Sequence, residues 1–541
     1  NDTLKYQVVL YLKENENYDK SLNIIEKHLE NHKDEASVYK FGWQKFRIFY
    51  ESGKVKEALS YLEDLSENLS GSKKDRAIFF LGIINFEENN FERSEAFFRD
   101  IVFSRPESKY FMLALYKLGL QYIYTGQEML MYSLWSEYIY SFDLVPWKYY
   151  YGRTVFSTMR QLFIYKDKCL GFYNFSSPKA ALCEQTDDEN YDGIGETYFS
   201  YYDIAYAHKI DGCMNKKRKI RGMNKEHIEL WEKNIIKYRD DYVGKIRENI
   251  QKIPFAVRSE EPFVMINRFN EAGLFSGMTF YARYIADLNR YNKQSDSEVP
   301  DILASFIDNP DASDRADSLW SNAVRYLLRD IYLLTGQYAK AINIHYNNVR
   351  KDLTFSPCKG LRKDWSFLYP TPYWETVKKL SIQFDISPAL MYSIMRAETF
   401  FRKELVSPVG ALGLMQVMPY TFEKISVRSG IKIENPLDPY DSMRAAAWYL
   451  NKLIMRFNGN IMLAAAAYNA GPHRVSKWLK NFQNVDAVLF SELIPFGETR
   501  RYVKKVLRYY EIYSYLYEGS FYDIQLKEKI STDENSKYVD F

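Results

Sequence analysis

One carboxylate in this chain has the spacing expected of a general acid. Met391, Ile394, Met395 and Glu398 recur at intervals of three and four residues, which places them on one face of a helix. Because three of these side chains are apolar, we expect the pKa of Glu398 to be raised and its carboxyl group to carry a proton near neutral pH. Such a group can donate a proton in catalysis. The alternative is that Glu398 reaches solvent at the last turn or pairs with an arginine.

The segments around this helix have equally distinct compositions. Ser387 and Pro388 predict its start, since serine can cap a helix and proline tolerates the first helical position. Residues 407–419 contain two glycines, two prolines and no charged residue. This segment is too rich in helix breakers for a helix and too apolar for an ordinary solvated loop. We therefore expect a tight turn beside the acid, with Gln416 as a polar contact among hydrophobic groups, as in sugar-binding clefts.

Four motifs in this region resemble, in the same order, those of the soluble lytic transglycosylases, periplasmic bacterial enzymes that cleave peptidoglycan. The motifs are Ala397-Glu398-Thr399, Gly413-Leu414-Met415-Gln416, Ala467-Tyr468-Asn469-Ala470-Gly471 and the stretch from Ile494 to Val503. Thr399 departs from the serine usual in the first motif but keeps the hydroxyl group. The resemblance is specific in the C-terminal third and extends to the remainder of the chain only as architecture.

This resemblance implies an all-α fold. An N-terminal α-superhelical solenoid, similar to tetratricopeptide repeats and closed into a ring, would support a C-terminal lysozyme-like α domain. Glu398 would be the catalytic residue, with no cofactor and no metal. The residues that would contact the glycan by the same resemblance are Ser407, Met415, Gln416, Met418, Tyr468, Asn469, Glu498 and Tyr502.

The reaction implied by the resemblance needs only one carboxyl group. Glu398 would protonate the oxygen between N-acetylmuramic acid and N-acetylglucosamine, and the substrate's own acetamido group would stabilise the cationic centre. Glu398 would then accept the proton of the muramyl C6 hydroxyl group, which closes a 1,6-anhydro ring without consuming water. The enzyme would be an exo-acting lyase, although the sequence leaves exo and endo cleavage open.

Three alternatives remain at this stage. A goose-lysozyme-like hydrolase would share the fold but release a reducing end. Ordinary glycosidases need two carboxylates. The carboxylates that follow Glu398, none of them in an obviously catalytic context, are Glu404, Glu423, Glu434, Asp438, Asp441, Glu492 and Glu498. An inactive repeat scaffold would need a broken motif, and Glu398 is intact. Individual residues also have structural interpretations: Tyr468 as a core tyrosine, and Glu498 as the partner of Arg500 or Arg501.

Composition narrows the classes of partner. The net charge is only +3, so the chain lacks the strong excess of basic residues that is typical of nucleic-acid-binding proteins. It contains no apolar run of eighteen residues, which predicts no transmembrane segment, and no secretory leader, so export would require a leader already removed. The expected partners are peptidoglycan strands with their stem peptides, in the periplasm. Peripheral association with the cell wall or outer membrane, and with other cell-wall enzymes, is open.

Cysteines and histidines form no metal-binding pattern. Cys169, Cys183, Cys213 and Cys358 match no zinc-ribbon spacing, and the six histidines are scattered, so we expect no metal site. In an oxidising compartment Cys169 could bridge to Cys183 or Cys213, but free thiols explain the pattern equally well.

The N-terminal part of the chain is repetitive. Turn-like segments begin near residues 17, 53, 89 and 126, about 36 residues apart, and a further copy begins at Thr335. Apolar periodicity on both sides of each turn predicts stacked helix–turn–helix units, as in tetratricopeptide repeats. A plain irregular helical domain is the weaker alternative.

Composition changes suggest where domains end. We expect a superhelical domain over residues 1–295, a helical linker over 296–364, the catalytic domain over 365–520 and a polar tail over 521–541. A polar insertion covers about 166–195. The basic run 216–221 favours a solvated loop over contact with an anionic polymer such as the cell wall.

Overall fold

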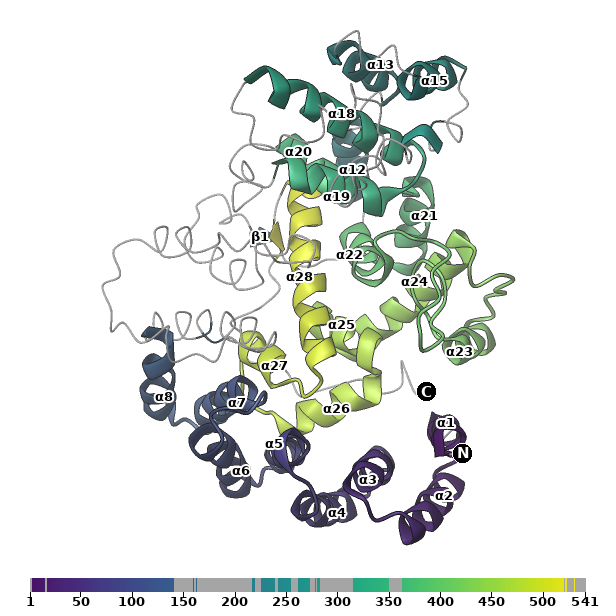
Figure 1. Ribbon diagram of the computed structural model, residues 1–541. Helices are drawn as coiled ribbons and strands as arrows, with labels where there is room; N and C mark the ends of the chain where they lie inside the picture. Colours follow the sequence, from purple (N-terminus) through teal and green to yellow (C-terminus); the bar gives the residue numbers. More distant parts are fainter. Residues whose placement is uncertain are drawn as a thin grey trace. The chain divides into compact units, whose positions relative to one another are not determined.

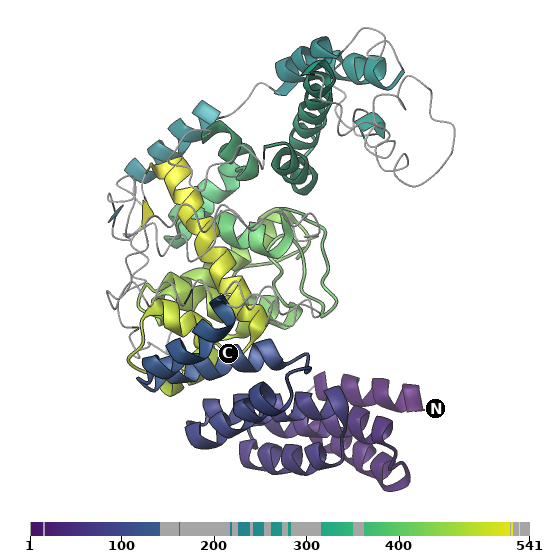
Figure 2. The ribbon, with the colours of Figure 1, turned by 60° about the vertical axis from the view of Figure 1, so that its left-hand side comes forward.

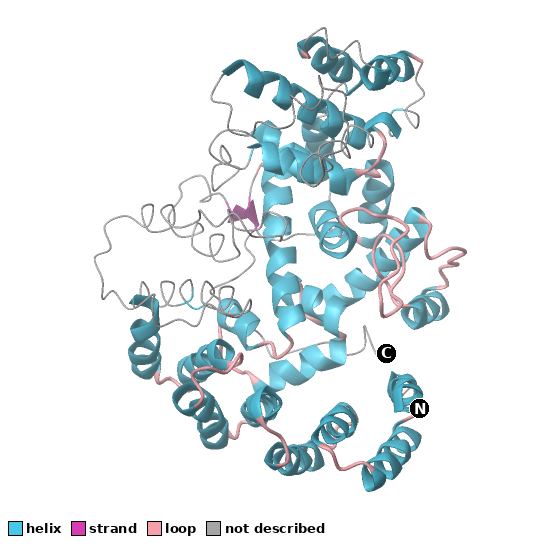
Figure 3. Ribbon diagram, viewed as in Figure 1, coloured by secondary structure: helices cyan, strands magenta, loops and turns pink. Residues whose placement is uncertain are grey.

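The computed structural model of the 541-residue chain describes residues 2–14, 17–140, 217–218, 225–238, 242–253, 261–272, 280–282, 315–349, 362–519 and 521–522, with a few single positions between them. Apart from two strands of two residues each, the regular elements of these ranges are helices (Figure 3). The four cysteines, the polar insertion and most of the basic run lie outside the described residues.

The first helices form antiparallel pairs in chain order (Figures 1 and 2). They are α1 (Asp2–Glu14), α2 (Tyr18–Asn31), α3 (Glu35–Glu51), α4 (Val55–Glu67), α5 (Gly71–Glu87), α6 (Phe91–Ser104), α7 (Phe111–Tyr124) and α8 (Glu128–Tyr140). Each helix packs on the next one in sequence, so apolar side chains of each helix are buried by its neighbours. The predicted helical repeats are confirmed.

The turns of these repeats share one backbone hydrogen bond. The amide of the residue before the second helix donates to the carbonyl group five positions earlier. The donor–acceptor pairs are Asn17–Leu12, Lys54–Phe49, Asn90–Asn85, Gln127–Tyr122 and, much later, Gln337–Tyr332, at 2.7 to 2.9 Å. The last pair joins α18 (Arg315–Leu334) to α19 (Tyr338–Val349), where the sequence predicted a further copy.

The chain divides into two compact units. One contains residues 1–177 together with 477–496, and the other contains 178–476 and 497–541. Residues 477–496 include the end of α26 (Pro472–Asn481) and α27 (Ala487–Leu493). They lie within the predicted catalytic domain but group with the N-terminal repeats.

Specific contacts tie this late segment to the repeats. The ring of Phe482 stacks on Phe86, with centroids 5.5 Å apart. Asn481 donates a 2.7 Å hydrogen bond to the carbonyl group of Glu87. The hydroxyl group of Tyr116 on α7 donates to the buried carboxylate of Glu492 on α27. Aromatic packing and buried polar pairs thus explain why the segment groups with helices nearly four hundred residues earlier.

The second unit contains the remaining described helices. They are α12 (Lys225–Tyr238), α13 (Tyr242–Lys252), α15 (Glu261–Glu271), α18, α19, α20 (Arg362–Leu368), α21 (Trp374–Phe384), α22 (Pro388–Thr399), α23 (Pro419–Ser429), α24 (Pro439–Arg456), α25 (Ile461–Ala470) and α28 (Gly497–Glu518). One apolar core joins α13, α15, α18 and α19 to Phe367 of α20.

The long helix α28, yellow in Figure 1, is the central element around the Glu398 helix: it packs against α22, α25 and α12. Its buried side includes Tyr509, Tyr513 and Tyr517, and Tyr513 stacks on Tyr392 of α22 at 5.3 Å. After α28, strand β2 (Phe521–Tyr522) pairs in parallel with β1 (Lys217–Arg218). The sequence analysis did not predict this short pairing, which involves part of the basic run.

Among the described residues, no helix has both the length and the apolar character needed to cross a membrane.

Candidate active site

Glu398 lies in the last turn of α22, as the sequence predicts. The helix begins at Pro388 with Ser387 at the N-cap position, which confirms the predicted start, but the side chain of Ser387 makes no capping hydrogen bond. Met391, Ile394 and Met395 are fully buried, which anchors the helix face that leads to Glu398. Glu398 itself is half-buried.

The pKa of Glu398 is raised to about 7, mainly by burial and to a smaller extent by the nearby charge of Glu498. The hydroxyl group of Tyr502 and the charge of Lys505 oppose this rise. Tyr502 is close enough to favour the carboxylate, but its hydroxyl group lies outside direct hydrogen-bond geometry with any described group. A carboxyl group with this pKa can both donate and accept a proton near neutral pH.

The next residue ties the helix end to the glycine-containing turn. The buried hydroxyl group of Thr399 lies 3.1 Å from the carbonyl oxygen of Met395 in its own helix and 3.0 Å from that of Leu414. The methyl group that distinguishes threonine from serine therefore leaves the hydroxyl contact intact. The tether fixes the distance between Glu398 and the turn at residues 413–416.

Residues 407–419 form the predicted tight turns, and three of them have left-handed backbones. Gly410 has φ +87°, Gly413 has φ +70° and Gln416 has φ +49°. The side-chain nitrogen Nε2 of Gln416 donates 2.9 Å hydrogen bonds to the backbone carbonyl groups of Leu405 and Gly413. The polar side chain thus supports the turn from within.

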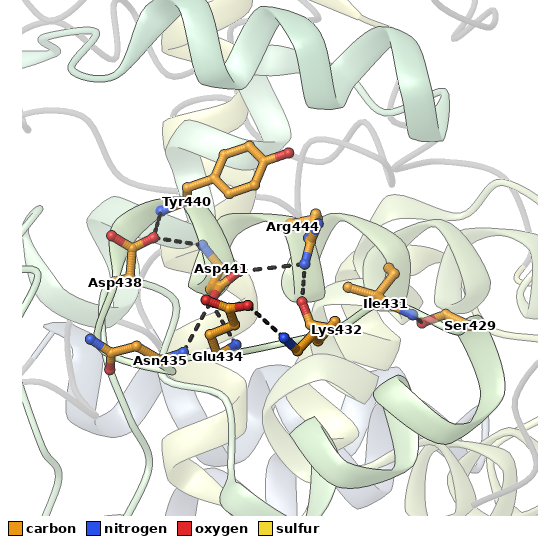
Figure 4. A network of polar contacts seen from close by, with 9 residues as sticks. All are labelled: Ser429, Ile431, Lys432, Glu434, Asn435, Asp438, Tyr440, Asp441 and Arg444. Atoms are coloured by element: carbon orange, nitrogen blue, oxygen red, sulfur yellow. Dashed lines mark hydrogen bonds and ion pairs between the residues drawn. The ribbon is translucent and has the colours of Figure 1, made fainter.

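A network of polar contacts shapes the loop between α23 and α24 (Figure 4). One carboxylate oxygen of Asp441 accepts hydrogen bonds from the amides of Glu434 and Asn435, at 2.9 and 3.0 Å. Asp438 caps α24 by accepting from the amides of Tyr440 and Asp441. These bonds shape the turn at residues 435–439.

The loop that contains Pro436 restricts which residue can occupy position 413 of the neighbouring turn. A β-carbon at Gly413 would lie only 2.4 Å from the carbonyl oxygen of Pro436, so glycine is required by space as well as by φ. The amide of Met415 donates to the hydroxyl group of Ser442 at 3.2 Å. The turn is therefore held between Thr399 on one side and α24 with its loop on the other.

The end of α25 adds two more predicted residues. The hydroxyl group of Tyr468 donates a 2.8 Å hydrogen bond to the carbonyl group of Met415. Its pKa is raised by burial and then by the charge of Glu398. Asn469 accepts a 2.7 Å hydrogen bond from Thr499 on α28. Tyr468 is thus half-buried and lies beside Glu398.

The predicted site residues differ in where they lie. Glu398, Tyr468 and Tyr502 come together, since burial and then the charge of Glu398 raise the pKa of both tyrosines. Glu498 is exposed near them. The side chain of Met415 is fully buried, and its backbone forms the contacts described above.

Two predicted residues sit at the edges of the turn segment. Ser407 closes a tight turn by accepting a 2.9 Å hydrogen bond from the amide of Ala411. Met418 is half-buried immediately before α23, and its carbonyl group accepts from the amide of Thr421 at 2.9 Å.

Sequence reasoning missed Arg396, which supports the helix two residues before Glu398. Its buried guanidinium group lies 4.3 Å from the ring centre of Tyr369 and 4.8 Å from that of Tyr509. It also donates to the carbonyl group of Leu368. An arginine in an otherwise apolar helix is the sequence signal, and its aromatic surroundings are favourable for a buried cation.

Comparisons with known proteins bear on the family of this region. Residues 375–490 match the family model described as the transglycosylase SLT domain. Over these residues the chain is similar to transglycosylase SLT domains. Residues 493–520, which include α28, match the model of the soluble lytic transglycosylase helical domain. The family resemblance predicted from the four motifs is confirmed.

Individual relatives are similar over this part of the chain. The soluble lytic murein transglycosylase of Escherichia coli strain K12 is 35% identical over 208 residues, which are 37% of this chain and 31% of that protein. That of Salmonella typhimurium strain LT2 is 35% identical over 202 residues, 36% of this chain and 30% of that protein. The chain thus matches about a third of these relatives' length.

A solved structure extends the similarity beyond the SLT domain. An inactive mutant of the lytic transglycosylase Slt from Pseudomonas aeruginosa aligns with 96% of this chain and 74% of its own, with a TM-score of 0.53 and 18% identity. At this identity the likeness concerns the fold alone. It confirms the predicted all-α class, a helical superhelix with a lysozyme-like domain.

Proposed function

We propose that this protein is a periplasmic lytic transglycosylase that cleaves peptidoglycan during cell-wall turnover and remodelling. The observation that carries the proposal is Glu398: it is half-buried at the end of α22, its pKa is raised to about 7, and it lies in an SLT domain. The relatives named above are murein transglycosylases, which supports peptidoglycan as the substrate.

The first step is proton donation. Protonated Glu398 transfers its proton to the oxygen of the bond between N-acetylmuramic acid and N-acetylglucosamine. The bond from C1 of the muramyl residue to this oxygen breaks, and the N-acetylglucosamine side leaves with a hydroxyl group. The acetamido oxygen of the muramyl residue stabilises the positive charge that develops at C1.

The second step returns the proton. The Glu398 carboxylate accepts the proton of the muramyl C6 hydroxyl group, and O6 forms a bond with C1. This closes the 1,6-anhydro ring, restores protonated Glu398 and consumes no water. The raised pKa of Glu398 suits both steps because proton transfer is most efficient when the pKa is near the working pH.

The other residues would hold the glycan and the acid in place. Burial raises the pKa of Tyr468 and Tyr502, so both phenols stay protonated and can donate hydrogen bonds beside Glu398. Glu498 is exposed and Asn469 is half-buried, which leaves their polar groups accessible to a sugar. Gln416, Met418 and Ser407 would contribute to glycan binding from the turn segment, and the backbone of Met415 would fix Tyr468.

One observation keeps hydrolysis as a second candidate. The charge of Glu498 contributes to the raised pKa of Glu398, so a second carboxylate is close enough to influence the first. In an inverting hydrolase such a group would activate a water molecule. In the lytic mechanism it would orient the substrate.

The products distinguish the two reactions. Purified sacculi are digested with the full chain, and the soluble fragments are analysed by mass spectrometry before and after borohydride reduction. Lytic cleavage gives 1,6-anhydromuramyl ends, lighter by one water and resistant to borohydride. Muramyl ends that are reduced quantitatively would establish the hydrolase instead.

A further inference from the structure

Three residues of the kinds that bind metal ions converge far from the SLT domain in sequence. Asp2 lies in α1, His28 lies in the last turn of α2, and His32 is the residue that follows the end of α2. One ligand atom from each of the three side chains lies within 4.8 Å of the other two. Among the described residues, no other group of three histidine, cysteine or acidic side chains meets this distance criterion.

His28 is the unusual member of the group. Its side chain is 1% exposed, and neither ring nitrogen has a hydrogen-bond partner among the described groups. The nearest acidic oxygen, on Asp2, is 3.7 Å from Nδ1, too far for a hydrogen bond. A buried polar group without a hydrogen-bond partner destabilises the folded state. A ligand bound at Nδ1 would supply one of the two missing partners of this ring.

His32 has a nitrogen available for the same ligand. Its Nδ1 lies 3.0 Å from the carbonyl oxygen of His28, so in the neutral ring Nδ1 carries the hydrogen and donates it. Nε2 then carries the lone pair. Metal-binding histidines commonly donate the other ring N–H to a backbone carbonyl group in this way.

Two aromatic rings pack against the imidazole ring of His28. The ring is enclosed between His32, at a centroid distance of 4.2 Å, and Phe41 of α3, at 3.8 Å. Neutral imidazole nitrogens and a carboxylate oxygen form a donor set typical of zinc and related ions.

We propose that Asp2, His28 and His32 bind one divalent transition-metal ion, with Zn²⁺ as the reference ion. Bonds of about 2.0–2.1 Å would draw the three ligand atoms to roughly 3.3 Å from one another. The two imidazole rings are parallel within 9°, so one ring must turn to aim its lone pair at the ion. His32 is half-exposed and can turn, and solvent occupies the fourth position.

The proposed ion would be structural. It would connect α1 to α2, and α1 exposes Leu4 and Tyr11, each 66% exposed, while burying Val9. A ligand that binds only the folded state stabilises it. This inference is independent of the lytic reaction, because none of its residues belongs to the SLT domain match. The signal in the sequence is the His-x-x-x-His spacing at the C-terminal end of α2, which the scattered positions of the other histidines obscured.

The test uses the full chain after treatment with a chelator. Zn²⁺ is titrated at pH 7.5 by calorimetry, and melting temperature is measured with and without the ion. The variants are His32→Gln and Asp2→Asn, which remove ligands at accessible positions; His473→Gln, an exposed histidine on α26, is the matched control.

We expect one Zn²⁺ per chain and a higher melting temperature in the wild type and in His473→Gln. Binding should weaken roughly tenfold or more in His32→Gln and in Asp2→Asn, and the gain in melting temperature should disappear. Unchanged binding in both ligand variants, an equal loss in His473→Gln, or no binding by the wild type would overturn the proposal.

Discussion

The hydroxyl group of Tyr468 donates a 2.8 Å hydrogen bond to the backbone carbonyl group of Met415. This bond joins the end of α25 to the turn at residues 413–416, which Thr399 connects in turn to the Glu398 helix. The candidate acid and the segments around it are therefore linked by hydrogen bonds between side chains and backbone, not by packing alone.

Removing that hydroxyl group should impair turnover more than stability. In Tyr468→Phe the carbonyl group of Met415 loses its donor, and Glu398 loses a neighbouring phenol. We expect turnover of sacculi to fall about 10- to 100-fold. The loss of stability should be about 1 kcal/mol.

The matched control for this change is Tyr449→Phe, because the ring of Tyr449 contacts Tyr468 at a centroid distance of 5.7 Å. Turnover and denaturant unfolding are measured for both variants. Equal effects of the two variants on turnover would show that the hydroxyl group of Tyr468 has no specific role.

Thr399 offers a test of the tether between α22 and the turn. Thr399→Ser keeps the hydroxyl group that lies 3.0 Å from the carbonyl oxygen of Leu414 and should retain most of the activity. Thr399→Val has nearly the same shape without the hydroxyl group and should lose about 1–3 kcal/mol of unfolding free energy together with turnover. If Thr399→Val matched Thr399→Ser in both measurements, the tether would be unimportant.

The glycine turn provides a matched pair of substitutions. Both Gly413 and Gly410 have positive φ, at +70° and +87°, but only Gly413 has a close neighbour, the carbonyl oxygen of Pro436. Gly410→Ala should lose about 1 kcal/mol of unfolding free energy from backbone strain alone. Gly413→Ala should lose more than that and most of its activity, since the backbone of the turn must move. Similar unfolding free energies for the two variants would contradict this account of the turn.

The pKa of Glu398 predicts how stability and activity depend on pH. Because the folded state raises this pKa from 4.5 to about 7, the folded protein binds the proton more tightly than the unfolded chain. Ionisation therefore reduces stability progressively as pH rises from about 4.5 to 7. Activity that needs the protonated acid should decline above about pH 7.

Glu398→Gln cannot ionise, so its melting temperature relative to the wild type should be higher at pH 8 than at pH 5. Thermal unfolding across this range checks the sign. A constant difference between variant and wild type would mean that the pKa of Glu398 is not raised by folding.

Sequence alone predicted the position and the apolar environment of Glu398 because the signal is local. The apolar spacing of Met391, Ile394 and Met395 predicts both the helix face and the environment of Glu398, and the structure shows that all three are buried. The breaker-rich segment likewise predicted the turn, since glycine and proline act through their own backbones. Arg396 was missed because its role depends on Tyr369, which follows α20, and on Tyr509 of α28, and neither belongs to its own helix.

The grouping of residues 477–496 shows the same limit of local signals. The motifs that flank this segment predict one continuous catalytic domain. The partners of Phe482 and Glu492, however, are Phe86 and Tyr116 in the repeats. No periodicity within the segment specifies partners that are nearly four hundred residues away, so this part of the architecture required the structure.

In the proposed reaction, Glu398 donates a proton to the glycosidic oxygen and then accepts one from the C6 hydroxyl group. The most direct measurement is the rate at which the full chain releases soluble fragments from purified sacculi, for the wild type, Glu398→Gln and the exposed control Glu404→Gln. We predict that Glu398→Gln loses nearly all turnover while it keeps its fold and binds sacculi, and that Glu404→Gln behaves as the wild type. Turnover by folded Glu398→Gln within about tenfold of the wild type would contradict the claim, because a neutral amide cannot donate this proton.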